Sequence, residues 1–235
     1  MAVLANVTVD CLDPPALARF WSRLLGWPVV DEDPEVVSVR SPGGLDLDFA
    51  PVQEPKRGQN RIHLDLASDT PAEQLELVER AVELGARHAD VGQDGVPWVV
   101  LADPEGNEFC VLEPRETYRE TGRIAAVVVS SPDPRGAARF WSRALDLPVA
   151  HDEEGFTGLR IVPGLPALEF LPGPAKSRKD RLHLDLRGAD QDETVAALLA
   201  LGARRVDVGQ GDVSWVVLAD PDGGELCVLA DPPGR

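Results

Sequence analysis

The chain has 235 residues, of which 43% are hydrophobic, and a formal net charge of −17 at pH 7. This acidic balance argues against nucleic acid and anionic membranes as partners, because both need basic patches. No apolar run approaches the roughly 18 residues that cross a bilayer, and the start of the sequence shows no signal-peptide pattern. Its three cysteines include no closely spaced pair, so no disulfide framework is indicated. We expect a cytoplasmic protein.

The first predicted unit is a strand, a helix and three short strands. Residues 3–10 have the composition of a strand, and Asp13 then precedes two prolines as the N-cap of a helix. Gly26 is placed to end that helix. Further strands are expected over residues 28–30, 36–40 and 45–50. A polar connector over 51–60 separates this unit from the next.

The second predicted unit repeats the same order. A strand over 61–66 is followed by Thr70-Pro71-Ala72-Glu73, which has the pattern of a capping box. The helix is expected to end at Gly85. Strands are then expected over residues 87–91, 98–102 and 108–112. The first half of the chain therefore contains the unit β-α-β-β-β twice.

The second half of the chain repeats the first. Arg61-Ile62-His63-Leu64-Asp65-Leu66 returns as Arg181-Leu182-His183-Leu184-Asp185-Leu186, an offset of 181 − 61 = 120 residues. Other repeated segments are 19–23 with 139–143 and 98–104 with 215–221. A period near 120 indicates two homologous domains. We expect one domain over 1–115, a linker over 116–122 and a second domain over 123–235.

Polar residues alternate with apolar ones along the strand over 61–66. Arg61, His63 and Asp65 fall on one face, while the isoleucine and leucines fall on the other, as in a half-buried strand. Because this row occurs twice, we favour a cavity-facing row over a solvated face.

These motifs resemble the vicinal oxygen chelate superfamily, which includes glyoxalase I, bleomycin-resistance proteins and extradiol dioxygenases. The resemblance is carried by the Asp-Pro-Glu-Gly-Asn turn over 103–107, the Phe-Trp-Ser-Arg-x-Leu motif in the first helix, and the Arg-x-His-Leu-Asp-Leu strand. It implies an α+β fold of two tandem domains, each a pair of β-α-β-β-β units that form a curved mixed sheet around a cleft. It further implies that the domains pair internally, so that a monomer is sufficient.

The resemblance also implies a divalent metal, with one ligand from each of four strands, usually His, Glu, His and Glu. In the first domain these positions fall on Asn6, Asp48, His63 and Cys110. Cysteine is a good zinc ligand but a poor one for hard ions. Whether this domain binds a metal stays open.

In the second domain the same positions fall on Ala126, Glu169, His183 and Cys227. Alanine cannot ligate, so we predict no tightly bound divalent ion there. We favour both cysteines as neutral core thiols. The candidate metal ligands are therefore Asp48, His63, Cys110, Glu169, His183 and Cys227, for zinc, nickel, manganese or iron, and no cofactor is certain.

The sequence leaves two function classes. The favoured one binds a small aromatic or amphipathic molecule in a cleft, for resistance or sequestration. The alternative is a glyoxalase-like lyase or isomerase, or a dioxygenase-type enzyme, that uses a divalent metal on a small oxygenated substrate. Candidate catalytic residues are His63 and His183. Candidate ligand-binding residues are Asn6, Arg61, Trp98, Arg181 and Trp215, with a packed core role equally open for the two tryptophans.

Overall fold

The computed structural model describes residues 2–32, 36–93, 95–153 and 155–230. The first half contains β1 (Val3–Cys11), α1 (Pro14–Leu25), β2 (Val29–Glu32), β3 (Val37–Val39), β4 (Asp46–Pro51), β5 (Ile62–Leu66), α2 (Pro71–Glu83), β6 (Arg87–His88), β7 (Val99–Ala102) and β8 (Glu108–Val111). A short 3-10 helix, η1 (Glu116–Tyr118), follows. The second half contains β9 (Ile124–Ser131), α3 (Pro134–Leu145), β10 (Val149–Glu153), β11 (Phe156–Leu159), β12 (Ala167–Pro172), β13 (Leu182–Arg187), α4 (Gln191–Ala200), β14 (Arg204–Arg205), β15 (Val216–Ala219) and β16 (Glu225–Val228). The predicted four β-α-β-β-β units are confirmed.

The helices begin and end where local chemistry directs them. The Asp13 side chain accepts a hydrogen bond from the Ala16 backbone N–H at 2.9 Å, which caps α1. Gly26 ends α1 in the left-handed region with φ of 75°, where glycine carries no Cβ penalty. The Thr70 hydroxyl accepts from the Glu73 N–H at 3.1 Å and so caps α2.

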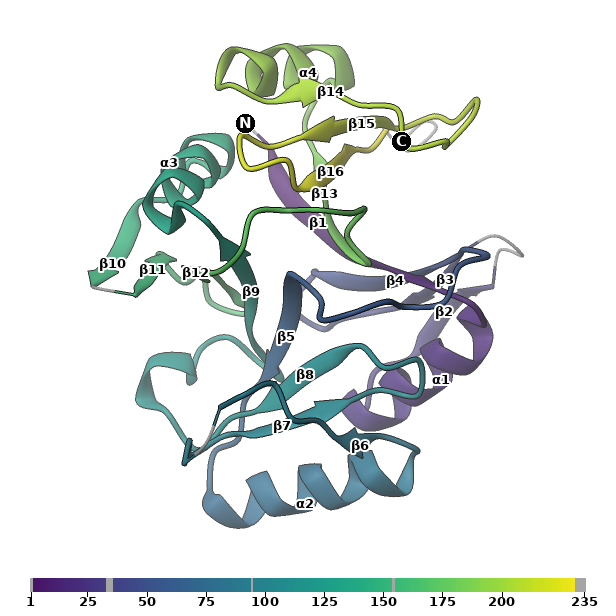
Figure 1. Ribbon diagram of the computed structural model, residues 1–235, viewed down its shortest axis with the longest axis vertical. Helices are drawn as coiled ribbons and strands as arrows, with labels where there is room; N and C mark the ends of the chain where they lie inside the picture. Colours follow the sequence, from purple (N-terminus) through teal and green to yellow (C-terminus); the bar gives the residue numbers. More distant parts are fainter. Residues whose placement is uncertain (1, 33–35, 94, 154, 231–235) are drawn as a thin grey trace.

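The two halves exchange units to build two mixed sheets. Sheet A has the strand order β14-β15-β16-β13-β1-β4-β3-β2, and sheet B has the order β10-β11-β12-β9-β5-β8-β7-β6. The halves meet where β1 pairs antiparallel with β13, and β5 with β9. Each sheet therefore joins one unit from each half of the chain (Figure 1).

The exchange of units between the halves can be compared with the predicted fold class and domain limits. The α+β class, the mixed sheets and the internal pairing of the halves agree with the prediction. The proposed domain limits, 1–115 and 123–235, stay a prediction, and Met1 and residues 231–235 lie outside the described residues. No helix in the described ranges is both long and apolar enough to span a membrane.

Strand alternation separates the two faces of each sheet. Leu64, Leu66, Phe49, Phe109 and Val111 are all at most 1% exposed and belong to the main hydrophobic core, with residues of the helices. Because side chains alternate along a strand, the residues between them point to the opposite face. That opposite face carries the candidate site residues described below.

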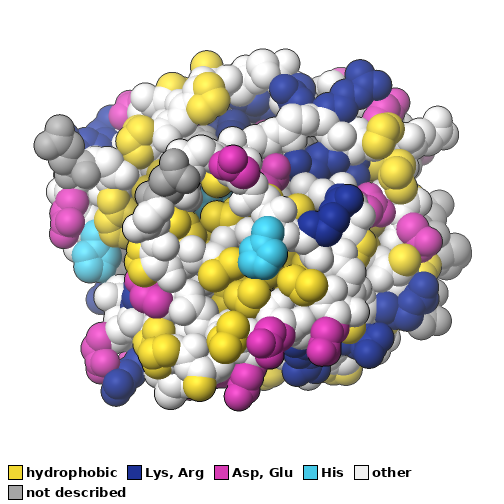
Figure 2. Space-filling view, turned by 60° about the horizontal axis from the view of Figure 1, so that its bottom comes forward, with side chains coloured by type: hydrophobic (Ala, Val, Ile, Leu, Met, Phe, Trp, Pro, Cys, Tyr) yellow, Lys and Arg dark blue, Asp and Glu magenta, His cyan; other side chains and the backbone are white. Residues whose placement is uncertain are grey.

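The predicted apolar stripe of α2 is only partly covered. Val78 and Ala81 are buried, whereas Leu75 is 58% and Val82 43% exposed. Leu75, Val78, Val82 and Val99 line an open groove of about 600 Å³. Figure 2 shows the face that carries α2, with apolar side chains exposed among acidic ones. This groove is separate from the site residues.

Two buried arginines connect the halves of the chain. Arg61 Nε lies 3.3 Å from Asp180 Oδ2, and its Nη1 donates to the Ser130 carbonyl oxygen at 2.8 Å. Arg181 Nη2 lies 3.1 Å from Glu105 Oε2. Both arginines therefore bind carboxylates of the protein itself, and their predicted contact with a ligand stays a prediction.

Candidate functional site

The register of sheet A gathers six residues on the face away from the main core. Across the β1–β13 pair, Asn6 lies opposite Asp185 and Thr8 lies opposite His183. Thr8 also lies opposite Asp48 on β4, and Asp185 lies opposite Cys227 on β16. We define site A by these residues: Asn6, Thr8, Asp48, His183, Asp185 and Cys227.

The register of sheet B builds the equivalent site from the other two units. Asp65 lies opposite Ala126 on β9 and opposite Cys110 on β8. His63 lies opposite Val128, which in turn lies opposite Glu169 on β12. We define site B by these residues: His63, Asp65, Cys110, Ala126, Val128 and Glu169.

The expected grouping of the candidate ligands by domain is wrong. Asp48 was assigned to His63 and Cys110 of its own domain, but the structure places it in site A with His183 and Cys227. Glu169 correspondingly joins His63 and Cys110. The cause is the pairing of β1 with β13 and of β5 with β9, which brings strands of opposite halves together. His63 and Leu64 lie on opposite faces of the sheet, as the alternation of side chains along the strand predicts.

A hydrogen-bonded network fills site A. The Asn6 amide donates to Asp48 Oδ2 at 2.9 Å and to Asp185 Oδ2 at 2.8 Å, and the Thr8 hydroxyl donates to Asp185 Oδ2 at 2.6 Å. Burial raises the pKa of Asp48 to about 6, a hydrogen bond from Ser38 opposes the rise, and Asp185 adds to it. The Asn6 amide therefore lies between two carboxylates and donates hydrogen bonds to both, where a cation could otherwise bind.

Site B is more apolar and is closed by the linker. Cys110, Ala126 and Val128 belong to a small buried cluster that also contains Tyr118 of η1. The Tyr118 hydroxyl donates to Glu169 Oε1 at 2.8 Å, and the residue is 7% exposed. Burial raises the pKa of Glu169 to about 7, against the opposing effect of this hydrogen bond. The linker thus supplies a side chain to site B, which the sequence did not indicate.

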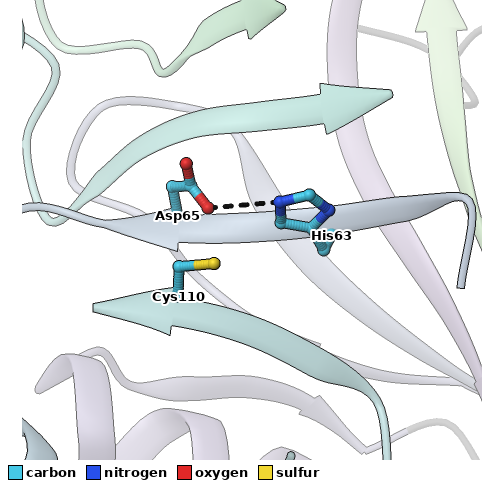
Figure 3. Close-up of side chains that lie close together, drawn as sticks. All are labelled: His63, Asp65 and Cys110. Atoms are coloured by element: carbon cyan, nitrogen blue, oxygen red, sulfur yellow. Dashed lines mark ion pairs between the residues drawn. The ribbon is translucent and has the colours of Figure 1, made fainter. Parts of the chain in front are cut away.

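Each site contains a cluster of one His, one Asp and one Cys. In site B the potential ligand atoms of His63, Asp65 and Cys110 all lie within 4.8 Å of one another, and Figure 3 shows them on the same side of β5 and β8. In site A the same holds for His183, Asp185 and Cys227. His63 Nε2 lies 3.4 Å from Asp65 Oδ1, and the equivalent atoms of His183 and Asp185 in site A are 3.6 Å apart.

The donor set of these clusters fits a borderline-soft ion better than a hard one. Asp65 Oδ1 and Asp185 Oδ1 are buried and accept no hydrogen bond from any described residue, so each can accept a cation. Burial, then the neighbouring aspartate, raises the pKa of the Cys110 and Cys227 thiols. Both thiols are therefore protonated without metal and must lose a proton to ligate one. A thiolate, an imidazole and a carboxylate suit zinc more than magnesium or calcium.

The two tryptophans differ in their surroundings. Trp98 packs against the small cluster of site B, and the guanidinium of Arg115 lies 5.4 Å from its ring centroid. Trp215 precedes β15, where Val217 lies opposite Cys227, so strand parity puts it on the site A face. Trp215 is 36% exposed.

Sequence reasoning missed four participants, of which Thr8 gave no signal of its own. Asp65 and Asp185 were noted in the polar row but not counted as ligands, although their position two residues after each histidine puts them on the same face. Tyr118 lies in the predicted linker, where no periodic pattern signals burial. His63 and His183 are brought to the sites, and their catalytic role stays a prediction.

The fold and the polar clusters on its sheets define a class of protein. The sequence profile of the glyoxalase-like domain matches residues 6–112 and again residues 126–229, so the chain belongs to the glyoxalase-like domain family. Glyoxalase I from Zea mays is similar in structure, with 14% identity, a TM-score of 0.73, and coverage of 98% of this chain and 92% of that chain. A putative dioxygenase from Bacillus subtilis gives 15% identity, a TM-score of 0.67, and coverage of 98% and 86%. At this identity the two structures support the fold alone. Among curated proteins, none matches the chain.

Proposed function

We propose that the protein binds a small aromatic or amphipathic molecule at site A and sequesters it. The observation that carries this proposal is the asymmetry of the tryptophans. Trp98 is covered by Arg115 in site B, whereas Trp215 is 36% exposed on the site A face. An exposed tryptophan ring on the same sheet face as buried polar groups offers a ligand both a stacking surface and fixed hydrogen-bond partners.

The charges of site A favour a ligand with a cationic or hydrogen-bond-donating end. Asp10 lies on β1 two residues after Thr8 and is 5% exposed, so it faces the same side as Asp48 and Asp185. The cation paired with Asp10 is Lys179. Three carboxylates against one lysine leave the region acidic, which suits an aromatic amine.

Calorimetric titration tests the proposal with a panel of small aromatic amines and the matching uncharged aromatics. We expect an amine of the panel to bind wild-type protein, and Trp215→Ala to weaken that binding by about tenfold or more, the loss of one cation–π and stacking contact. Trp98→Ala is the matched control and should leave the affinity within about twofold. Equal losses in both variants, or tighter binding of the uncharged aromatics, would contradict the assignment to site A.

A second candidate, a metal-dependent lyase or isomerase, is favoured by Glu169. Its pKa of about 7 is raised by burial, and a general base works best when its pKa is near the working pH. The family resemblance implies a small oxygenated substrate. Turnover of the methylglyoxal–glutathione hemithioacetal after addition of zinc, nickel, manganese or iron, abolished by Glu169→Gln, would favour this candidate over sequestration.

A further inference from the structure

Independently of ligand binding at site A, we propose that site B holds a zinc-class ion through His63, Asp65 and Cys110. In this arrangement Asp65 takes the place of the ligand that β9 lacks at Ala126. The usual ligand positions of the superfamily do not include Asp65. The inference rests on three features of the chain: the spacing of the donor atoms, the unpaired Oδ1 of Asp65, and the contrast with site A.

The donor atoms are close to the spacing that zinc needs. Tetrahedral zinc, with ligand bonds of about 2.0–2.3 Å, separates its ligand atoms by roughly 3.3–3.6 Å. His63 Nε2 and Asp65 Oδ1 are already 3.4 Å apart, and the Cys110 Sγ lies within 4.8 Å of both. The three side chains come from adjacent strands, β5 and β8, and lie on one side of them (Figure 3). Cys110 is the third member of the ligand set that we assign to the ion.

One oxygen of the Asp65 carboxylate is buried without a donor. The residue is 8% exposed, and its Oδ1 accepts no hydrogen bond from any described residue. The residue opposite it on β9 is Ala126, and Val128 lies opposite His63, so neither of these β9 residues can donate a side-chain hydrogen bond to Asp65. A buried carboxylate without a donor is costly, and a bound cation removes that cost.

Site A contains the same three residue types, and its Asp185 Oδ1 is unpaired like that of Asp65, but the other oxygen of Asp185 accepts two hydrogen bonds from β1. Asp185 Oδ2 accepts from Asn6 at 2.8 Å and from Thr8 at 2.6 Å. In site A, Asn6 and Thr8 thus stabilise the buried aspartate by hydrogen bonds, a role that we assign to the metal ion in site B. We therefore assign the tighter metal site to site B, and site A supplies a matched control in the same chain.

Binding of the ion is an acid–base step without redox chemistry. The Cys110 S–H bond breaks, its proton leaves to bulk water, and the sulfur forms a bond to the metal as a thiolate. His63 ligates through Nε2 as the neutral imidazole, and Asp65 as the carboxylate. Three protein ligands leave the fourth tetrahedral position to water. The ion has one soft ligand, which favours zinc or cobalt over magnesium.

Cobalt(II) titration of the full chain, freed of metal with a chelator, tests the site directly. We expect saturation near one equivalent, with a near-ultraviolet thiolate-to-cobalt charge-transfer band and strong visible bands of a tetrahedral ion. Cys110→Ser should abolish the charge-transfer band, and Asp65→Asn should weaken cobalt binding by more than about tenfold. Cys227→Ser and Asp185→Asn, the equivalent changes in site A, should leave both the band and the affinity in place.

Two results would overturn the assignment. The first is wild-type protein that shows no charge-transfer band with excess cobalt. The second is a band lost in Cys227→Ser but kept in Cys110→Ser. Circular dichroism of each variant checks that it is folded. If Cys110→Ser does not fold, the comparison of Asp65→Asn with Asp185→Asn decides between the sites, because these substitutions preserve side-chain size.

Discussion

Replacement of Asn6 by alanine removes the donor that lies between the two carboxylates of site A. The Asn6 amide donates to Asp48 at 2.9 Å and to Asp185 at 2.8 Å, and Asn6 is 6% exposed. Hydrogen bonds to charged groups contribute about 1.5–3 kcal/mol each. Because Thr8 still donates to Asp185, we expect Asn6→Ala to lower the free energy of unfolding by about 3 kcal/mol at pH 8.

The loss of unfolding free energy in Asn6→Ala should be smaller at low pH than at high pH. Burial raises the pKa of Asp48 from 3.8 to about 6. A raised acid pKa means that the native state binds the proton more tightly, so the stability it contributes is present at low pH and is lost as the pH rises through about 6. Removal of the Asn6 donor raises this pKa further. The loss in Asn6→Ala should therefore fall to about 1–2 kcal/mol at pH 5, where Asp48 is protonated.

Urea denaturation at pH 5 and pH 8, followed by circular dichroism, measures both values. The control repeats the comparison in an Asp48→Asn background, where residue 48 can no longer titrate and the cost of Asn6→Ala should differ much less between the two pH values. A cost in the otherwise wild-type chain that is equal at both pH values, or greater at pH 5, would refute the proposed role of Asn6.

Two further predictions concern the linker and the junction of the halves. Tyr118→Phe should lower the unfolding free energy by about 1 kcal/mol through the lost hydrogen bond to Glu169. Tyr118→Ala should lower it by about 3–5 kcal/mol and create binding of a hydrophobic dye. Equal losses of stability for the two variants in thermal denaturation would show that Tyr118 does not fill site B. Arg61→Ala leaves Asp180 buried without its cation and should lower the unfolding free energy by about 3–5 kcal/mol. The control Arg40→Ala removes an exposed ion pair and should change the unfolding free energy by less than about 1 kcal/mol. Similar midpoints of urea denaturation for the two variants would contradict this reasoning.

Local features of this protein could be predicted from the sequence because neighbouring residues decide them. The caps at Asp13 and Thr70 are hydrogen bonds between residues three apart, and Gly26 ends α1 through its own backbone freedom. The facing of His63 follows from alternation along one strand. The duplication at a spacing of 120 residues likewise shows that the chain has two similar halves, whatever their arrangement.

Which strand lies beside which was decided only by the tertiary structure. The four units are alike, so the β1 edge is chemically compatible with β5 of its own half as well as with β13 of the other. Strand pairing depends on backbone hydrogen bonds that carry little sequence information, and the pairing chosen here moves Asp48 to His183 and Glu169 to His63. The burial of Tyr118 is equally non-local, because a residue of an irregular linker fills whatever space the packed sheets leave beside it. The alternation along each strand therefore set which residues face each site, and the pairing between distant strands set which of them meet.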